Sequence, residues 1–145
     1  MNRTTAREIA VQILFIEKFG SVNLDDFLTE SNFEALSQDC DFYTGKPECD
    51  QIPYIREVVE AFRDHKEEVD AFISNYSKDR AINRISGTAL AVLRCAITEI
   101  LYIADVPTAV AINSAVEIDK GYDEEDTVAF VNGILGSFVR DREDK

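Results

Sequence analysis

The sequence predicts an all-α fold of about seven helices, and three observations support this prediction. Apolar residues recur three and four positions apart along most of the chain, which is the period of an amphipathic helix. No segment alternates apolar and polar residues in the way that a half-buried strand does. Glycine, proline and capping residues divide the chain into segments of helical length.

The segment Arg84–Ala104 organises the expected fold. Its apolar residues fall on more than one face of a helix, and such a helix is usually buried on several sides. Ser86 is the expected N-cap, because its hydroxyl can accept a hydrogen bond from a first-turn N–H. Three charged residues interrupt the apolar run, which is also at the short end for a membrane span. We therefore expect a core helix around which the other helices pack.

Capping and packing signals place the other helices. Thr5 and Glu8 have the spacing of a capping box, while Asn23 and Asp123 can cap the second and the last helix. Gly133 lies within the last helix, where its cost relative to alanine suggests close helix packing. The inward face of the first helix is expected to hold Ile9, Ala10, Ile13, Leu14 and Ile16. The expected helices span about residues 5–18, 23–36, 53–65, 66–76, 86–104, 108–120 and 123–139.

The composition is that of one globular domain spanning residues 1–145, with 46% apolar and 30% charged residues. The formal net charge of −13 argues against indiscriminate binding to nucleic acids or membrane surfaces, which are themselves negative. This charge still permits a local basic patch. The N-terminus lacks the uninterrupted apolar core of a signal peptide, so we expect a cytoplasmic protein that does not contact a membrane.

The residues that carry metal or catalytic chemistry are sparse. Cys95 lies in the central helix and is expected to be a small core residue. Cys40 and Cys49 lie in an expected loop, Ser37–Gln51; they can close it, but two free thiols are favoured. The single histidine and the lack of metal-ligand spacing argue against a metal site. With no glycine-rich phosphate loop and no nucleophile elbow, we expect neither catalysis nor a cofactor.

Two basic and two aromatic residues are candidates for binding a nucleic acid. Arg3 and Arg7 stand at the start of the first helix, where cations oppose the helix dipole and can serve an anion such as RNA phosphate. Phe15 and Phe130 lie on helices and can stack on unpaired bases if they are exposed. The alternative is that the arginines are merely solvated and the phenylalanines are peripheral core residues.

Several segments, in matching order and spacing, resemble the NusB family of bacterial transcription antitermination proteins. The resemblance covers nearly the whole chain and is strongest over residues 94–135. The segments are AREIAVQIL at 6–14, RCAITEIL at 94–101, VP at 106–107, VAINSAVEIDK at 110–120 and FVNGIL at 130–135.

This resemblance implies two small helical bundles packed together, and no catalysis. It implies binding of boxA, a short single-stranded RNA element, together with NusE, a small-subunit ribosomal protein. The pair would then join an RNA polymerase antitermination complex. By resemblance, Arg3, Arg7, Phe15 and Phe130 match positions that contact RNA, and Asp126 matches an acidic position that faces NusE.

A second hypothesis is a helical interaction module, such as a homodimer, with little RNA affinity of its own. The net charge and the thin basic cluster at the N-terminus favour this module, whereas the match along the whole chain favours an RNA-binding factor. We expect weak RNA binding by the protein alone and stronger binding with NusE.

Overall fold

The computed structural model describes residues 3–28, 51–78 and 80–143. Within this part of the chain the structure holds seven α-helices, one short 3-10 helix and no strand, so the all-α prediction is confirmed. None of these helices has the length and hydropathy to cross a membrane. The elements are α1 (Arg3–Ile16), α2 (Leu24–Phe27), α4 (Ile52–Asp64), α5 (Lys66–Tyr76), η1 (Ile82–Arg84), α6 (Gly87–Tyr102), α7 (Thr108–Lys120) and α8 (Glu125–Glu143).

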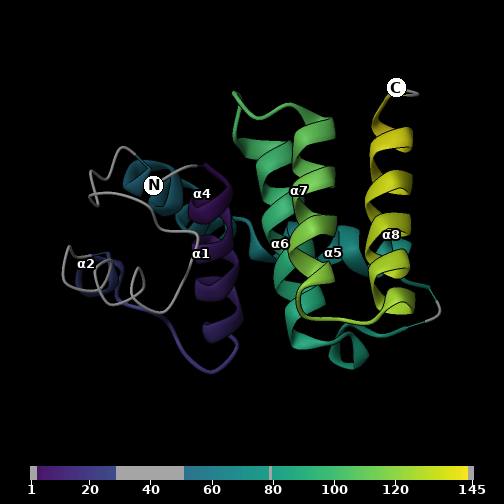
Figure 1. The fold of residues 1–145 in the computed structure, drawn as a ribbon, viewed down its shortest axis with the longest axis horizontal. Coiled ribbons are helices and arrows are strands. Elements are labelled where there is room, and N and C mark those ends of the chain that lie inside the picture. The colour runs from purple at the N-terminus through teal and green to yellow at the C-terminus, as the bar shows by residue number, and fades with distance from the viewer. Residues whose placement is uncertain (1–2, 29–50, 79, 144–145) are drawn as a thin grey trace.

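Helix α6 is the buried centre of the fold, as predicted. It contacts α1 and α4 on one side and α5, α7 and α8 on the other, which gives two helical groups that share it (Figure 1). Its residues 89–93 and 95–99 are buried. Arg94 instead reaches α5, where its guanidinium donates two hydrogen bonds to the Asp70 carboxylate at 2.9 and 3.0 Å.

Two of the predicted caps are confirmed. The Asn23 side chain accepts a hydrogen bond from the N–H of Asp26 at 3.1 Å, and Ser86 accepts one from the N–H of Ala89 at 3.1 Å. Both bonds satisfy a first-turn N–H that has no partner inside its own helix. The entry into α6 is therefore set by local chemistry that is visible in the sequence.

Three other local predictions are wrong. Helix α1 already includes Arg3, so Thr5 lies inside the helix and is not its cap. Helix α8 begins at Glu125, and Asp123 accepts a hydrogen bond from the Ser86 hydroxyl instead of capping it. Ile16, the last residue of α1, is 43% exposed because the helix ends there beyond the core. The expected loop with Cys40 and Cys49 lies outside the described residues.

Gly133 is also placed differently from its prediction. Apart from its chain neighbours and the backbone of its own helix, no heavy atom lies within 4 Å of the position that a Cβ would take at Gly133, and the residue is exposed. The close packing that its mid-helix position suggested is therefore absent.

We expect Gly133→Ala to stabilise the protein by about 1 kcal/mol, because alanine has the higher helix propensity and the site has room for its methyl group. Thermal unfolding should show a midpoint about 2–4 °C higher. Gly20→Ala is the matched control: Gly20 also has open space around it, but its φ of 151° strains other residues, so its midpoint should fall. A lower midpoint for Gly133→Ala would contradict the placement of this helix face.

Candidate nucleic-acid interface

Arg7 lies in the interior of the protein and pairs with Glu99. The Arg7 side chain donates from Nε to Oε1 of Glu99 at 2.8 Å and from Nη2 to Oε2 at 3.0 Å. Its Nη1 donates to Oγ of Ser114 at 3.0 Å, so one guanidinium joins α1, α6 and α7. Arg7 is only 3% exposed and Glu99 is fully buried. The expectation that Arg7 presents its guanidinium to a phosphate, or to solvent, does not fit this position.

The electrostatics of the pair favour the charged form of Arg7. Burial alone would lower the pKa of Arg7, but the hydrogen bond and the charge of Glu99 outweigh burial and raise it. Glu99 was not singled out in the sequence. The available signal was a carboxylate inside an almost wholly apolar helix, since a charge in that setting is rarely buried without a partner.

Tyr54 brings Arg3 and Arg7 together. The guanidinium carbon of Arg3 lies 4.0 Å from the centre of the Tyr54 ring, and that of Arg7 lies 5.9 Å from it. Arg3 also donates to the side chain of Gln51 at 2.7 Å and remains partly exposed. Beside this group, burial first and Glu99 second raise the pKa of Cys95, so its thiol stays protonated. Cys95 is a free, buried core residue, as predicted.

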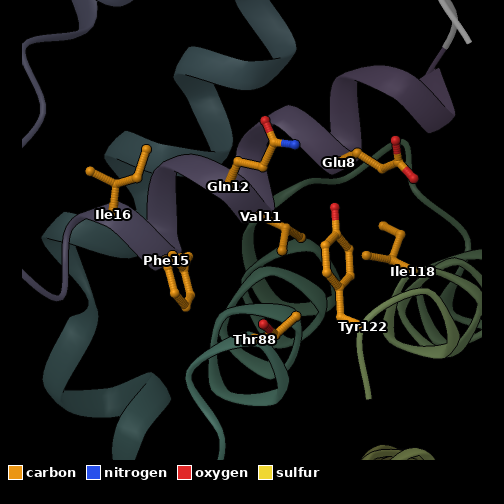
Figure 2. Close-up of a pocket in the computed structure, with 8 residues that line it drawn as sticks. All are labelled: Glu8, Val11, Gln12, Phe15, Ile16, Thr88, Ile118 and Tyr122. Atoms are coloured by element: carbon orange, nitrogen blue, oxygen red, sulfur yellow. The ribbon is translucent and has the colours of Figure 1, made fainter. Parts of the chain in front are cut away.

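Phe15 borders a pocket of about 360 Å³ between α1, α6 and α7. Its ring is 38% exposed and lies against Gly87, where a Cβ would come within 2.7 Å of the ring. Figure 2 shows the Tyr122 ring between Val11 and Ile118, with its hydroxyl directed towards α1. Glycine at position 87 therefore lets an aromatic ring seal one side of the pocket. The lining residues are Glu8, Val11, Gln12, Phe15, Ile16, Thr88, Ile118 and Tyr122.

Further exposed aromatic rings flank this pocket. Phe19 is 78% exposed and packs edge-to-face on Phe15, with 6.1 Å between the ring centres, and Tyr122 is 58% exposed. Burial raises the pKa of Glu8 on the pocket rim. The sequence analysis missed Tyr122, because it follows the end of a helix and so belongs to no periodic pattern.

Phe130 and Asp126 lie one turn apart near the start of α8. Phe130 is half-buried, and the guanidinium carbon of Arg80 lies 4.5 Å from the centre of its ring. Asp126 is exposed, and its carboxylate accepts a hydrogen bond from the N–H of Thr127 at 3.0 Å. Phe130 is thus partly buried and packs against the core, which agrees with the alternative of a peripheral core residue and not with a fully exposed ring.

The structure brings the five candidate residues together only in part: Arg3 lies near Arg7, Asp126 lies near Phe130, and Phe15 lies apart from both pairs. Arg3 and Arg7 meet at Tyr54. Arg3 lies about 18 Å along α1 from Phe15. Phe15 lies near the start of α6, and the Ser86 hydroxyl there donates to the Asp123 carboxylate just before α8. The end of α1, the start of α6 and the start of α8 lie towards the same end of the molecule, with α1 and α8 on opposite sides of α6 (Figure 1).

Asp119 is a second buried ionisable side chain, near the end of α7. It is fully buried, and among the described residues neither carboxylate oxygen has a hydrogen-bond donor. Burial, followed by the neighbouring Asp123 carboxyl, raises its pKa to about 7. A proton on Asp119 allows the two carboxyl groups to share a hydrogen bond. Ile118, directly before Asp119, and Tyr122, three residues after it, both line the pocket.

The fold and these surfaces define a class: a small all-helical protein with one shared central helix and an aromatic end that is open to a ligand. Comparison with known proteins makes the class specific. Residues 4–140 match the NusB family. The chain is 40% identical over 141 residues to the "Transcription antitermination protein NusB" of Thermoanaerobacter sp. (strain X514), covering 97% of this chain and 92% of that protein. This chain belongs to the NusB family.

Solved structures agree with this assignment. The T. maritima NusB structure superposes with a TM-score of 0.73 at 28% identity, covering 97% of this chain and 92% of that one. A crystal structure of the antitermination factors NusB and NusE in complex with dsRNA contains a chain that matches with a TM-score of 0.72 at 21% identity, covering 95% and 96%. At this identity, the match to the complex shows a shared fold alone.

We expect Arg7→Met to lower the free energy of unfolding by about 3–5 kcal/mol, because it leaves the buried Glu99 carboxylate without its cationic partner. Urea denaturation measures this loss. The double variant Arg7→Met/Glu99→Leu should recover most of it, because both buried charges are then gone. Arg56→Met is the control: it breaks an exposed pair with Asp25 and should cost less than about 1 kcal/mol. If Arg7→Met lowered the free energy of unfolding no more than Arg56→Met does, the buried pair would not be needed for stability.

The raised pKa of Asp119 predicts a specific pH dependence. The folded state holds the Asp119 proton up to about pH 7, while the unfolded chain releases it near its ordinary value of 3.8. This contribution to stability is therefore present at low pH and is lost as the pH rises towards 7. Asp119→Asn, which stays neutral, should gain about 2 kcal/mol relative to the wild type between pH 5.5 and pH 8.5. Parallel stability curves for the two proteins would rule out the protonated carboxyl.

Proposed function

We propose that this chain is a transcription antitermination factor that binds single-stranded boxA RNA together with NusE and then joins an RNA polymerase complex. Residues 1–145 would act as one RNA-binding domain, without a catalytic step, in the cytoplasm where transcripts are made. The observation that carries the proposal is the gathering of exposed aromatic rings around the pocket between α1, α6 and α7, in a chain of the NusB family.

Exposed rings beside a pocket suit an unpaired RNA strand. The bases of such a strand offer flat faces that stack on aromatic side chains, and each stacked base contributes about 1–3 kcal/mol. Phe15 is held at the pocket by Gly87, and Phe130 is held beside Arg80, so both rings are positioned before RNA arrives. We assign base contacts to these two phenylalanines.

The two arginines receive different roles in this proposal. Arg3 is partly exposed on the face of Tyr54 and is available to a phosphate. Arg7 contributes through its pair with Glu99, which fixes α1 and therefore Phe15 against α6. Its effect on RNA binding would be indirect.

The acidic start of α8 suits a basic protein partner. Glu124, Glu125 and Asp126 are all exposed and follow one another closely in the chain, whose net charge is −13. Complementary charge speeds and orients the docking of such a partner. NusE, as a ribosomal protein, would bring the positive charge that this chain lacks, and Asp126 is the proposed contact.

A titration of boxA-like RNA by fluorescence anisotropy, with and without NusE, tests this function. Wild-type protein should bind weakly alone and at least about tenfold more tightly with NusE. Phe15→Ala and Phe130→Ala should each weaken binding about 5- to 150-fold, the equivalent of one lost stacking contact. Tyr102→Ala is the control, because this aromatic residue lies at the opposite end of α6 and stacks on His65. Failure to bind RNA in the presence of NusE, or equal losses in the control, would refute the proposal.

A homodimeric module remains the second candidate, favoured by the exposed apolar side chains at the pocket. Phe15, Ile16, Phe19 and Tyr122 form a surface that a second copy could cover. Sedimentation of the protein alone separates the two functions. A stable dimer that Phe19→Ser dissociates, with no RNA binding at any NusE concentration, would favour the module.

A further inference from the structure

The segment between α5 and α6 concentrates positive charge in an acidic protein. Lys78, Arg80 and Arg84 fall within seven residues; with Asp79 among them, residues 78–84 carry a net charge of +2 in a chain of −13. Lys78 and Arg84 are exposed, and Arg80 is half-buried. Among the described residues, none of the ion pairs involves Lys78, Arg80 or Arg84. The lysines and arginines that do form ion pairs are Arg7, Arg56, Arg63, Arg94 and Lys120.

The backbone holds these cations on an ordered turn. The N–H of Arg80 donates to the carbonyl of Ser77 at 3.0 Å, and the N–H of Arg84 donates to the carbonyl of Ala81 at 2.8 Å. Directly after this turn, Ile85 is buried in the core and anchors the segment. Charges on an anchored turn lose less conformational freedom on binding an anion than charges on a mobile tail.

Arg80 aligns this turn with Phe130. Its guanidinium carbon lies 4.5 Å from the centre of the ring, a cation–π contact between the turn and helix α8. A phosphate bound by Arg80 would therefore lie next to an aromatic ring. Phosphate-binding cations next to aromatic rings are the combination that proteins use to hold single-stranded nucleic acid.

The surrounding charge selects the kind of anion. The acidic residues Glu124, Glu125 and Asp126 lie within about two turns of Phe130, so a broad anionic surface such as a bilayer would meet repulsion there. The three cations would repel a basic protein from the turn itself, whereas the acidic start of α8 beside it can attract one. A single RNA strand is narrow enough to follow the cationic turn past the ring.

We propose that Lys78, Arg80 and Arg84 form a phosphate-binding strip that guides a single RNA strand across Phe130. This inference rests on the proposed function and adds binding residues to it. The strip places the positive charge for RNA on the turn before α6, in addition to Arg3 at the start of α1.

The test compares Arg80→Gln, Arg84→Gln and the double variant with Arg56→Gln, which removes one charge, as each single variant does, but on α4, away from the strip. The affinity for boxA-like RNA is measured in the presence of NusE from 50 to 200 mM salt. Each single strip variant should weaken binding about 3- to 10-fold, and the slope of log affinity against log salt should fall by about 0.7 per lost phosphate contact. Arg56→Gln should match the wild type in both measurements.

The results separate this inference from the proposed function. If the wild type binds RNA and the double variant binds it as tightly as Arg56→Gln does, the strip is overturned and the proposed function stands. If the double variant loses NusE in the absence of RNA, the strip is a protein contact and the inference is also overturned. A wild type that binds no RNA would refute both. Unfolding midpoints of the variants, expected to equal that of the wild type, exclude a folding defect.

Discussion

The ion pair between Arg7 and Glu99 is the constraint on which the arrangement of helices depends. It is bidentate, lies out of contact with water and extends to Ser114, so that one side chain of α1 is tied to both α6 and α7. Removing two charges from water is costly, and only good geometry with further hydrogen bonds offsets that cost. Any rotation or shift of α1 would lengthen these bonds. The pair therefore fixes the register of α1 against the central helix.

That register determines what is presented at the surface. Two turns after Arg7, Phe15 meets Gly87 at the start of α6, and the pocket opens beside it between α1, α6 and α7. The start of α6 is joined to the start of α8 by the hydrogen bond between Ser86 and Asp123. The core pair and this surface bond together bring an aromatic pocket, an acidic helix start and the Arg80–Phe130 contact towards one end of a small protein.

The helices and most of their buried faces could be predicted because their signals are local. The 3.6-residue period, the caps at Asn23 and Ser86 and the apolar run of α6 depend on residues within one or two turns of each other. The errors at Thr5 and Asp123 have a different origin. Both residues have side chains suited to capping, but α1 begins before Thr5, and Asp123 instead accepts a hydrogen bond from Ser86, which is distant in sequence. Local pattern alone does not reveal such competition.

The candidate site was predictable only in part, because the sequence does not show which charged side chains are buried. Sequence alone determined the all-α class, the central helix, the family resemblance and the residue types available for RNA. Only the tertiary structure decided that Arg7 meets a carboxylate 92 positions away, that Phe15 stays exposed and that Arg80 covers Phe130. Periodicity reports how one helix divides its faces, whereas the pairing of charges depends on how separate helices approach one another, and that approach is set by the packing of the whole core.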